Sequence, residues 1–214
     1  LLVPHINPDG DALGSVAAFM QFLHSIGKPC GGFCAATIPD NLKALPYSEH
    51  IKTDAAIWKE NYDLIITLDC GDIKRAGITS YISKLAEKPL IINIDHHATN
   101  ENFGDHNMVM PDSSSTAEVL YHFFKYNEIQ IDAAMATCLL AGLITDTDFF
   151  TNGSTSIKSL EITGALIAIG GNIKLIKEII FKNKTIGLLK VYGVILSRLK
   201  KHQEIDLIYT YITQ

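Results

Sequence analysis

Aspartate and histidine side chains gather at four places along this 214-residue chain, each at the end of an apolar run. Carboxylates and imidazoles bind divalent metal ions and transfer protons. Burying such groups beside an apolar run costs free energy unless a partner group or an ion compensates them. Because four separate segments share the pattern, it predicts metal-dependent chemistry. The segments are His5-Ile6-Asn7-Pro8-Asp9-Gly10-Asp11, Asp69 after residues 64–68, Asp95-His96-His97 after residues 90–94, and Asp146 shortly after Ile144.

The first segment has a spacing that suits two cations. His5 and Asp9 are four residues apart and Asp11 lies two further on, in a loop with a proline and a glycine. Alternate residues of such a loop can point the same way and reach two ions. A shared carboxylate, for which Asp69 is the candidate, bridges metals about 3.5–4 Å apart. Mixed nitrogen and carboxylate ligands favour manganese, and the lack of a cysteine partner argues against structural zinc.

Each of these residues also has an ordinary interpretation when it is taken alone. His5 would be a surface residue, and Asp9 and Asp11 would be turn residues that cap the following helix. Asp69 would belong to a turn, and Asp146 would end a helix, although a carboxylate there opposes the helix dipole. The coincidence of four such sites favours the metal interpretation.

Strands that alternate with helices over the first hundred residues predict an α/β fold with a parallel sheet. Ligands of such sheets bind at the carboxyl ends of the strands, so His5, Asp69, Asp95 and His96 are expected to meet there. Residues 100–115 are expected to form a loop. The expected strands are residues 1–3, 31–35, 64–68, 90–94 and 207–212, and the expected longer helices are residues 12–26, 116–126, 132–144, 155–169, 173–181 and 186–201.

The composition disfavours several function classes. Acidic residues outnumber Lys and Arg by 23 to 18, so the net charge of −5 provides no basic field for long nucleic acid. The four cysteines form no Cys-x-x-Cys pair, which predicts free thiols in a reducing, cytoplasmic setting. The apolar stretches are too short or too interrupted to span a bilayer, and no signal peptide is visible, so no membrane partner is expected.

Three other catalytic or nucleotide-binding motifs are missing from the sequence. There is no glycine-rich phosphate-binding loop that ends in Lys-Ser or Lys-Thr. Asn7-Pro8-Asp9-Gly10-Asp11 has the wrong glycine spacing for a dinucleotide fingerprint, and Ser113-Ser114-Ser115 forms no nucleophile elbow.

The four segments together resemble the motifs of the DHH phosphoesterase family. The first segment continues into Ala12-Leu13-Gly14-Ser15 and resembles the first motif, and Asp95-His96-His97 resembles the triplet that names the family. Leu68-Asp69-Cys70-Gly71-Asp72 resembles the second motif, and Gly142-Leu143-Ile144-Thr145-Asp146-Thr147 with Phe149 resembles the fourth. The first motif and Ser114-Ser115-Thr116-Ala117-Glu118 resemble the bacterial nanoRNase and pAp-phosphatase branch.

The resemblance implies a parallel five-stranded sheet with flanking helices and a site for two divalent ions, expected to be Mn²⁺. His97 would face the scissile phosphate and bind substrate, while Asp95 would orient neighbouring ligands. A hydroxide held between the ions would attack phosphorus in line, which gives His97, Asp69 and Asp95 the catalytic roles. By position, the implied ligands of one ion are His5, Asp9 and Asp69, and those of the other are Asp11, Asp69, His96 and Asp146.

The activity that the resemblance implies is a manganese-dependent phosphoesterase. Its substrates would be short single-stranded oligoribonucleotides or 3′-phosphoadenosine 5′-phosphate (pAp), and the mild acidity of the chain suits small substrates. The alternatives are a family II type inorganic pyrophosphatase, a phosphodiesterase for the linear dinucleotide pApA, and a non-catalytic nucleotide-sensing module. The sequence is compatible with either a monomer or a homodimer.

The resemblance also implies a division of the chain. Residues 1–182 would be the catalytic domain, residues 183–204 a linker helix, and residues 205–214 the first strand of a truncated second, substrate-binding domain. The Gly-Gly-His motif of that second domain does not occur in this sequence. The alternative for residues 207–212 is an edge strand of the main sheet.

Overall fold

The computed structural model describes residues 1–181 and 186–212. Its main sheet contains six strands in the order β3-β2-β1-β4-β5-β6, and all five neighbouring pairs are parallel. The central strand β4 pairs with β5 over five residues, from Leu64 opposite Leu90 to Leu68 opposite Ile94. The strands are β1 Leu2–Val3, β2 Gly32–Phe33, β3 Ile51–Lys52, β4 Leu64–Leu68, β5 Leu90–Asp95 and β6 His106–Val109.

The predicted α/β class with a parallel sheet and flanking helices is confirmed, but the sheet has six strands rather than five. Residues 100–115 are not all loop, because β6 lies within them and pairs with β5 from His106 opposite Ile92 to Val109 opposite Asp95. Strand β6 is a half-exposed edge strand that starts with His106 and Asn107, so it lacks the apolar run that marks a central strand.

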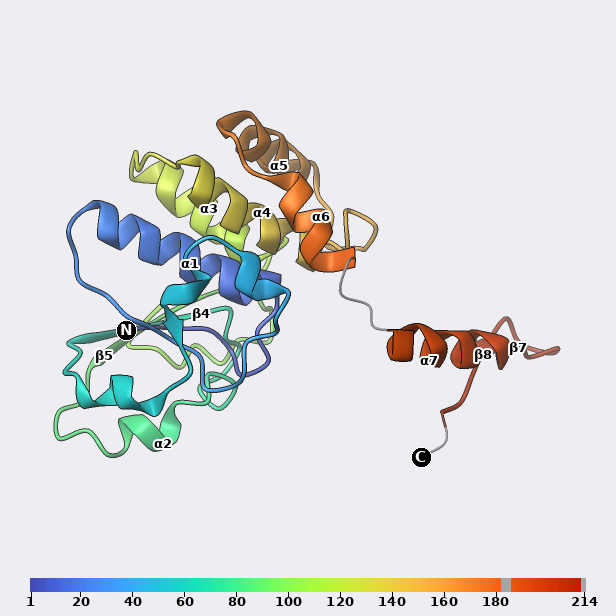
Figure 1. Cartoon of the computed structure of the whole chain (residues 1–214), viewed down its shortest axis with the longest axis horizontal. Coiled ribbons are helices and arrows are strands. Elements are labelled where there is room, and N and C mark those ends of the chain that lie inside the picture. The colour runs from blue at the N-terminus through green and yellow to red at the C-terminus, as the bar shows by residue number, and fades with distance from the viewer. Residues whose placement is uncertain (182–185, 213–214) are drawn as a thin grey trace.

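The helices pack on both faces of the sheet. Figure 1 shows α1, α3 and α4 together on one side of the sheet and α2 on the other, with α5 and α6 beyond α4. The helices are α1 Gly10–Ser25, α2 Thr79–Ile82, α3 Thr116–Tyr126, α4 Ala133–Asp146, α5 Ile157–Ile169, α6 Ile173–Phe181 and α7 Ile186–Ser197, with short 3₁₀ turns at Leu42–Ala44, Ser48–His50 and Ala55–Lys59.

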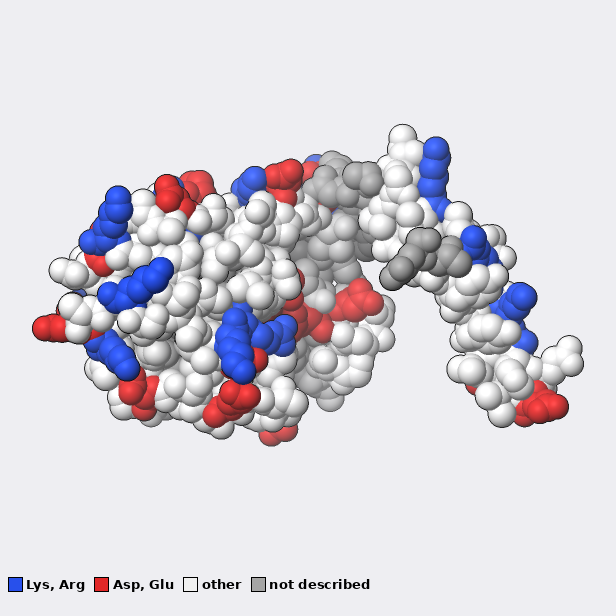
Figure 2. Space-filling model, turned by 90° about the horizontal axis from the view of Figure 1, so that it is seen from below, with Lys and Arg blue, Asp and Glu red and all other residues white. Residues whose placement is uncertain are grey.

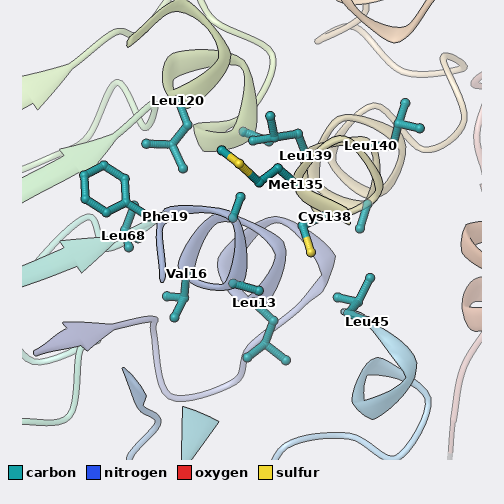
Figure 3. Close-up of a cluster of buried hydrophobic side chains, with 14 of the residues drawn as sticks. Leu13, Val16, Phe19, Leu45, Leu68, Leu120, Met135, Cys138, Leu139 and Leu140 are labelled. Carbon is teal, nitrogen blue, oxygen red and sulfur yellow. The ribbon is translucent and has the colours of Figure 1, made fainter. Parts of the chain in front are cut away.

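Side chains that alternate along the strands build a core on each face of the sheet. Ile66 and Leu68 of β4 join the larger cluster with α1, α3 and α4, whereas Ile65 joins the smaller cluster on the other face. Figure 3 shows the larger cluster, in which labelled side chains of the three helices lie together, with Phe19 and Leu68 side by side at one edge. A strand buried on both faces explains the continuous apolar run from which β4 was predicted.

Helices α1 and α4 approach each other closely at Gly14. A Cβ atom at this position would lie 2.3 Å from the carbonyl oxygen of Cys138, and that backbone atom cannot move aside. We expect Gly14→Ala to lower the free energy of unfolding by about 1–3 kcal/mol, the usual cost of overpacking. Denaturant titration followed by circular dichroism measures this change.

The matched control is Gly164→Ala, in an exposed part of α5 where the added Cβ meets nothing within 4 Å. Alanine is the better helix former by about 1 kcal/mol, so this variant is expected to be unchanged or more stable. A Gly14→Ala protein as stable as its Gly164→Ala counterpart would contradict the close helix packing.

The C-terminal residues form a separate small element. Strand β8 Ile208–Tyr209 pairs antiparallel with β7 Lys200–Lys201, so residues 207–212 are not an edge strand of the main sheet. Figure 1 places α7 and this hairpin beyond α6 and away from the sheet. The predicted boundary at residues 182–183 and the end of the chain at residues 213–214 lie outside the described residues, so the division into domains stays a prediction.

Two further sequence predictions concern the cysteines and the membrane. Cys30, Cys34, Cys70 and Cys138 are all free thiols, as their spacing predicted. Within the described part of the chain, no single helix has the length and apolarity needed to cross a membrane. The pair α5 and α6 meets those criteria only when both are counted together, and a bend of 117° separates them.

Candidate metal centre

The parallel sheet brings the predicted site residues to one edge. His5 follows β1, Asp69 follows β4, and Asp95-His96 ends β5 and begins the next loop. The amide of Asp69 donates to the carbonyl of Ile94 (3.0 Å), which holds the ends of β4 and β5 together. Asp9 and Asp11 lie at the start of α1, and Asp146 is the last residue of α4.

One group of ligand atoms comes from His5, Asp9 and Asp69 and could hold a metal ion. The Nε2 atom of His5 lies 3.5 Å from Oδ2 of Asp69 and 3.8 Å from Oδ2 of Asp9. His5 and Asp69 are buried, whereas the side chain of Asp9 is about half exposed.

A second group comes from Asp11, His96 and Asp146. Here Nε2 of His96 lies 3.1 Å from Oδ2 of Asp146 and 3.7 Å from Oδ1 of Asp69. Asp69 therefore turns one carboxylate oxygen toward each group. A carboxylate that bridges two ions would need this arrangement.

Asp95 and His97 form a hydrogen-bonded pair beside these groups, and with Asp69 and His96 they make a third cluster of ligand atoms. Burial opposes ionisation of Asp95, but hydrogen bonds from His97 and Asn100 outweigh it and lower its pKa. An ionised carboxylate only accepts hydrogen bonds, so Nδ1 of His97 donates to Oδ1 of Asp95 over 2.8 Å. This bond fixes the tautomer of His97, whose side chain is 34% exposed.

Asp9 can serve both as a helix cap and as a ligand, because its two carboxylate oxygens face different partners. Its Oδ1 accepts from the amides of Asp11 and Ala12, both at 3.0 Å, and so caps α1. Its Oδ2 is the oxygen that faces His5. The cap holds the carboxylate in a defined orientation toward the site.

The turns that carry two of the aspartates have left-handed backbones. Asp69 has a φ of +62°, and Asp148, Phe149 and Phe150 follow Asp146 with φ values of +47°, +56° and +63°. This region is uncommon for residues other than glycine and costs free energy, and such strain clusters at functional sites. The first turn directly follows β4, and the second follows the end of α4 at Asp146.

The electrostatics of the cluster reflect its crowded carboxylates. Burial disfavours the charged form of His5 and His96, but the carboxylates of neighbouring aspartates outweigh it and raise the pKa of each to about 9. Burial raises the pKa of Asp11, and the charges of Asp69 and Asp146 add to the effect. Divalent cations would displace protons from such a site on binding.

A structural observation that does not depend on the sequence motifs also indicates that these residues suit a divalent ion. Among the described residues, Nε2 of His96 is one of the few buried side-chain polar atoms without a hydrogen-bond partner, because the Asp146 oxygen 3.1 Å away does not meet hydrogen-bond geometry. A buried nitrogen of this kind is costly unless it binds something. Its surroundings of imidazole and carboxylate donors suit manganese, iron or zinc.

The structure thus brings together all eight predicted site residues. It also adds residues that sequence reasoning did not single out for the site. Asn100 donates to both the Asp95 carboxylate and the carbonyl of Cys70. The hydroxyl of Thr116 donates to Oδ1 of Asp69 over 3.0 Å. Thr116 lay in a quoted motif but had no predicted role, and nothing in the pattern around Asn100 marked it.

Comparisons with known proteins show which family the sequence matches. Residues 1–143 match the family profile described as "DHH family, N-terminal domain". The bifunctional oligoribonuclease and PAP phosphatase NrnA of Thermus thermophilus is 28% identical over 169 residues, which cover 79% of this chain and 49% of that protein. The protein of the same name from Bacillus subtilis is 26% identical over 172 residues, 78% of this chain and 52% of its own length.

A solved structure shares the fold. The crystal structure of an exopolyphosphatase-related protein from Bacteroides fragilis superposes with a TM-score of 0.85 at 28% identity, over 94% of this chain and 62% of that one. The chain spans about half the length of the curated relatives it matches.

Proposed function

This chain belongs to the DHH family, and we propose that it carries the metal centre of a manganese-dependent phosphoesterase for short oligoribonucleotides, pAp, or both. The observation that carries the proposal is Asp69, which presents one oxygen to each of two ligand groups. The names of the two NrnA relatives supply the substrate class.

The proposed ligands divide between two ions. When bound, the ions would activate a water nucleophile and offset the charge that builds on the phosphoryl oxygens. Asp69 bridges them. The proposed ligands of one ion are His5, Asp9 and Asp69, and those of the other are Asp11, Asp69, His96 and Asp146.

Asp95 and His97 act on the substrate side in this proposal. Asp95 holds His97 by its Nδ1–H, so the other ring nitrogen stays available on a partly exposed side chain. We assign His97 to the scissile phosphate and Asp95 to its orientation. Hydrogen-bonded partners of this kind typically change activity by about 10–100-fold when they are removed.

The charge of the molecule supports a small substrate. Figure 2 shows Lys and Arg mixed with Asp and Glu over one face of the sheet domain, without a continuous basic stripe. The net charge is −5. Long nucleic acids are held mainly by cationic contacts to phosphates, whereas a short oligonucleotide or pAp needs few of them.

A substrate panel tests the proposal. The protein is incubated with Mn²⁺ and pAp, di- to pentaribonucleotides, pApA or pyrophosphate, and the products are separated by anion-exchange chromatography. We expect phosphate from pAp or mononucleotides from the oligonucleotides. Hydrolysis of pyrophosphate alone would indicate a pyrophosphatase, cleavage of pApA alone a dinucleotide phosphodiesterase, and binding without turnover a nucleotide-sensing module.

A further inference from the structure

Residues 113–118 contact side chains from three distant parts of the candidate metal centre, and we call them the ligand clamp. The carbonyl of Ser113 lies 3.3 Å from Nδ1 of His96. The hydroxyl of Thr116 donates to Oδ1 of Asp69, 47 residues earlier in the chain. One turn of backbone thus reaches both the Asp69 carboxylate and the ring of His96.

The same turn also holds the carboxylate of Asp11. Its Oδ2 accepts from the amide of Thr116 (2.6 Å) and its Oδ1 from the amide of Ala117 (2.8 Å). These amides belong to the first turn of α3, where amide groups have no partner within the helix and the helix dipole favours negative charge. Asp11 is completely buried, so both of its oxygens need such donors.

Glu118 anchors the clamp from inside the protein. Its Oε2 accepts from both the amide (3.0 Å) and the hydroxyl (2.6 Å) of Ser114, while its own amide donates to the hydroxyl of Ser115 (3.1 Å). In a usual capping box the acidic residue bonds the amide of the cap itself. Here Glu118 reaches one residue further back and holds the loop next to the carbonyl of Ser113.

The remaining oxygen of Glu118 faces only a weak partner. Its Oε1 lies 3.7 Å from Nε2 of His122, one helical turn later on α3. Glu118 is 2% exposed and makes no contact with the predicted ligands in the hydrogen bonds and ion pairs of the described residues. Its effect on the site therefore passes through Ser114 and the clamp.

We infer that Thr116 and Glu118 are positioning residues of this centre, a role that rests on the proposed function. Thr116 fixes the rotation of the Asp69 carboxylate, so that each oxygen faces one ligand group. Glu118 fixes the loop whose carbonyl orients His96 and sets which ring nitrogen is free for the metal. Removing partners of this kind typically lowers metal affinity by about 10–100-fold.

Thr116→Val and Thr116→Ser form the deciding pair. Valine keeps the shape and the backbone amide but removes the hydroxyl, whereas serine keeps the hydroxyl. We expect Thr116→Val to bind Mn²⁺ about 10–100-fold more weakly in calorimetric titration, and Thr116→Ser to stay within about threefold of the original protein. The melting temperature of the metal-free protein controls for loss of structure.

Glu118 is tested by a second pair. Glu118→Gln keeps an oxygen that can accept both bonds from Ser114, and it should retain Mn²⁺ affinity. Glu118→Ala releases the loop and should lower the affinity at least about tenfold. Unchanged affinity in Glu118→Ala would overturn the role of Glu118; if this variant fails to fold, Ser114→Ala, which removes the hydroxyl that donates to Glu118, tests the same contact with the same expected direction.

The outcomes separate this inference from the proposed function. If the protein without substitutions binds no Mn²⁺, the proposed metal centre is wrong. Normal binding by the original protein, with the same affinity in Thr116→Val, would overturn the clamp and leave the metal centre standing.

Discussion

Asp69→Asn is expected to lower phosphoester hydrolysis by more than about 100-fold, the upper end of the loss for residues that only support a ligand. The larger effect is expected because Asp69 has one oxygen 3.5 Å from Nε2 of His5 and the other 3.7 Å from Nε2 of His96. An amide offers a single, neutral oxygen and cannot bridge two cations. Turnover of pAp and of a dinucleotide in Mn²⁺ measures the loss.

The control is Asp63→Asn, an identical change at the opposite end of β4. Asp63 is exposed and directly precedes the strand, whereas Asp69 directly follows it. The control is expected to keep activity within about twofold, since surface changes of this kind alter little. Asp69→Asn with undiminished turnover would contradict the bridging role.

Removal of divalent metal is expected to abolish hydrolysis completely, and added Mn²⁺ is expected to restore it. The carboxylates of Asp11, Asp69 and Asp146 lie so close that the charges of the other two raise the pKa of Asp11 further above its already burial-raised value. Bound cations would offset this repulsion, so they should also stabilise the fold. Binding at 100 times the dissociation constant contributes about 2.7 kcal/mol.

Activity after chelation and the melting temperature with increasing Mn²⁺ measure these two effects together. Ca²⁺ serves as the matched ion, since it prefers six to eight oxygen ligands and suits a site with imidazoles poorly. A protein that hydrolyses its substrates at full rate in excess chelator would rule out the metal mechanism.

The sequence predicted the central elements well because their patterns are local. The apolar run at residues 64–68 forms β4, and the helices predicted at residues 116–126 and 132–144 appear as α3 and α4 with ends shifted by at most two residues. The rule that ligands gather at the carboxyl ends of parallel strands then placed Asp69 and His96 correctly beside each other.

What the sequence did not reveal depends on contacts between distant residues. The hydroxyl of Thr116 donates to Asp69, which is 47 residues away in the sequence. The amide of Thr116 donates to Asp11, at a separation of 105 residues. A short polar edge strand such as β6 becomes a strand only because β5 offers it hydrogen bonds. The left-handed turn at residues 148–150 likewise contains no glycine from which it could have been predicted.

The measurement that tests the central claim most directly is anomalous diffraction at the manganese absorption edge, from crystals grown with Mn²⁺. Two peaks about 3.5–4 Å apart on either side of Asp69 are the expected result. One peak should lie near His5 and Asp9, and the other near His96 and Asp146. An ordered, manganese-soaked crystal with no anomalous peak at Asp69 would contradict the assignment of this edge of the sheet as a metal centre.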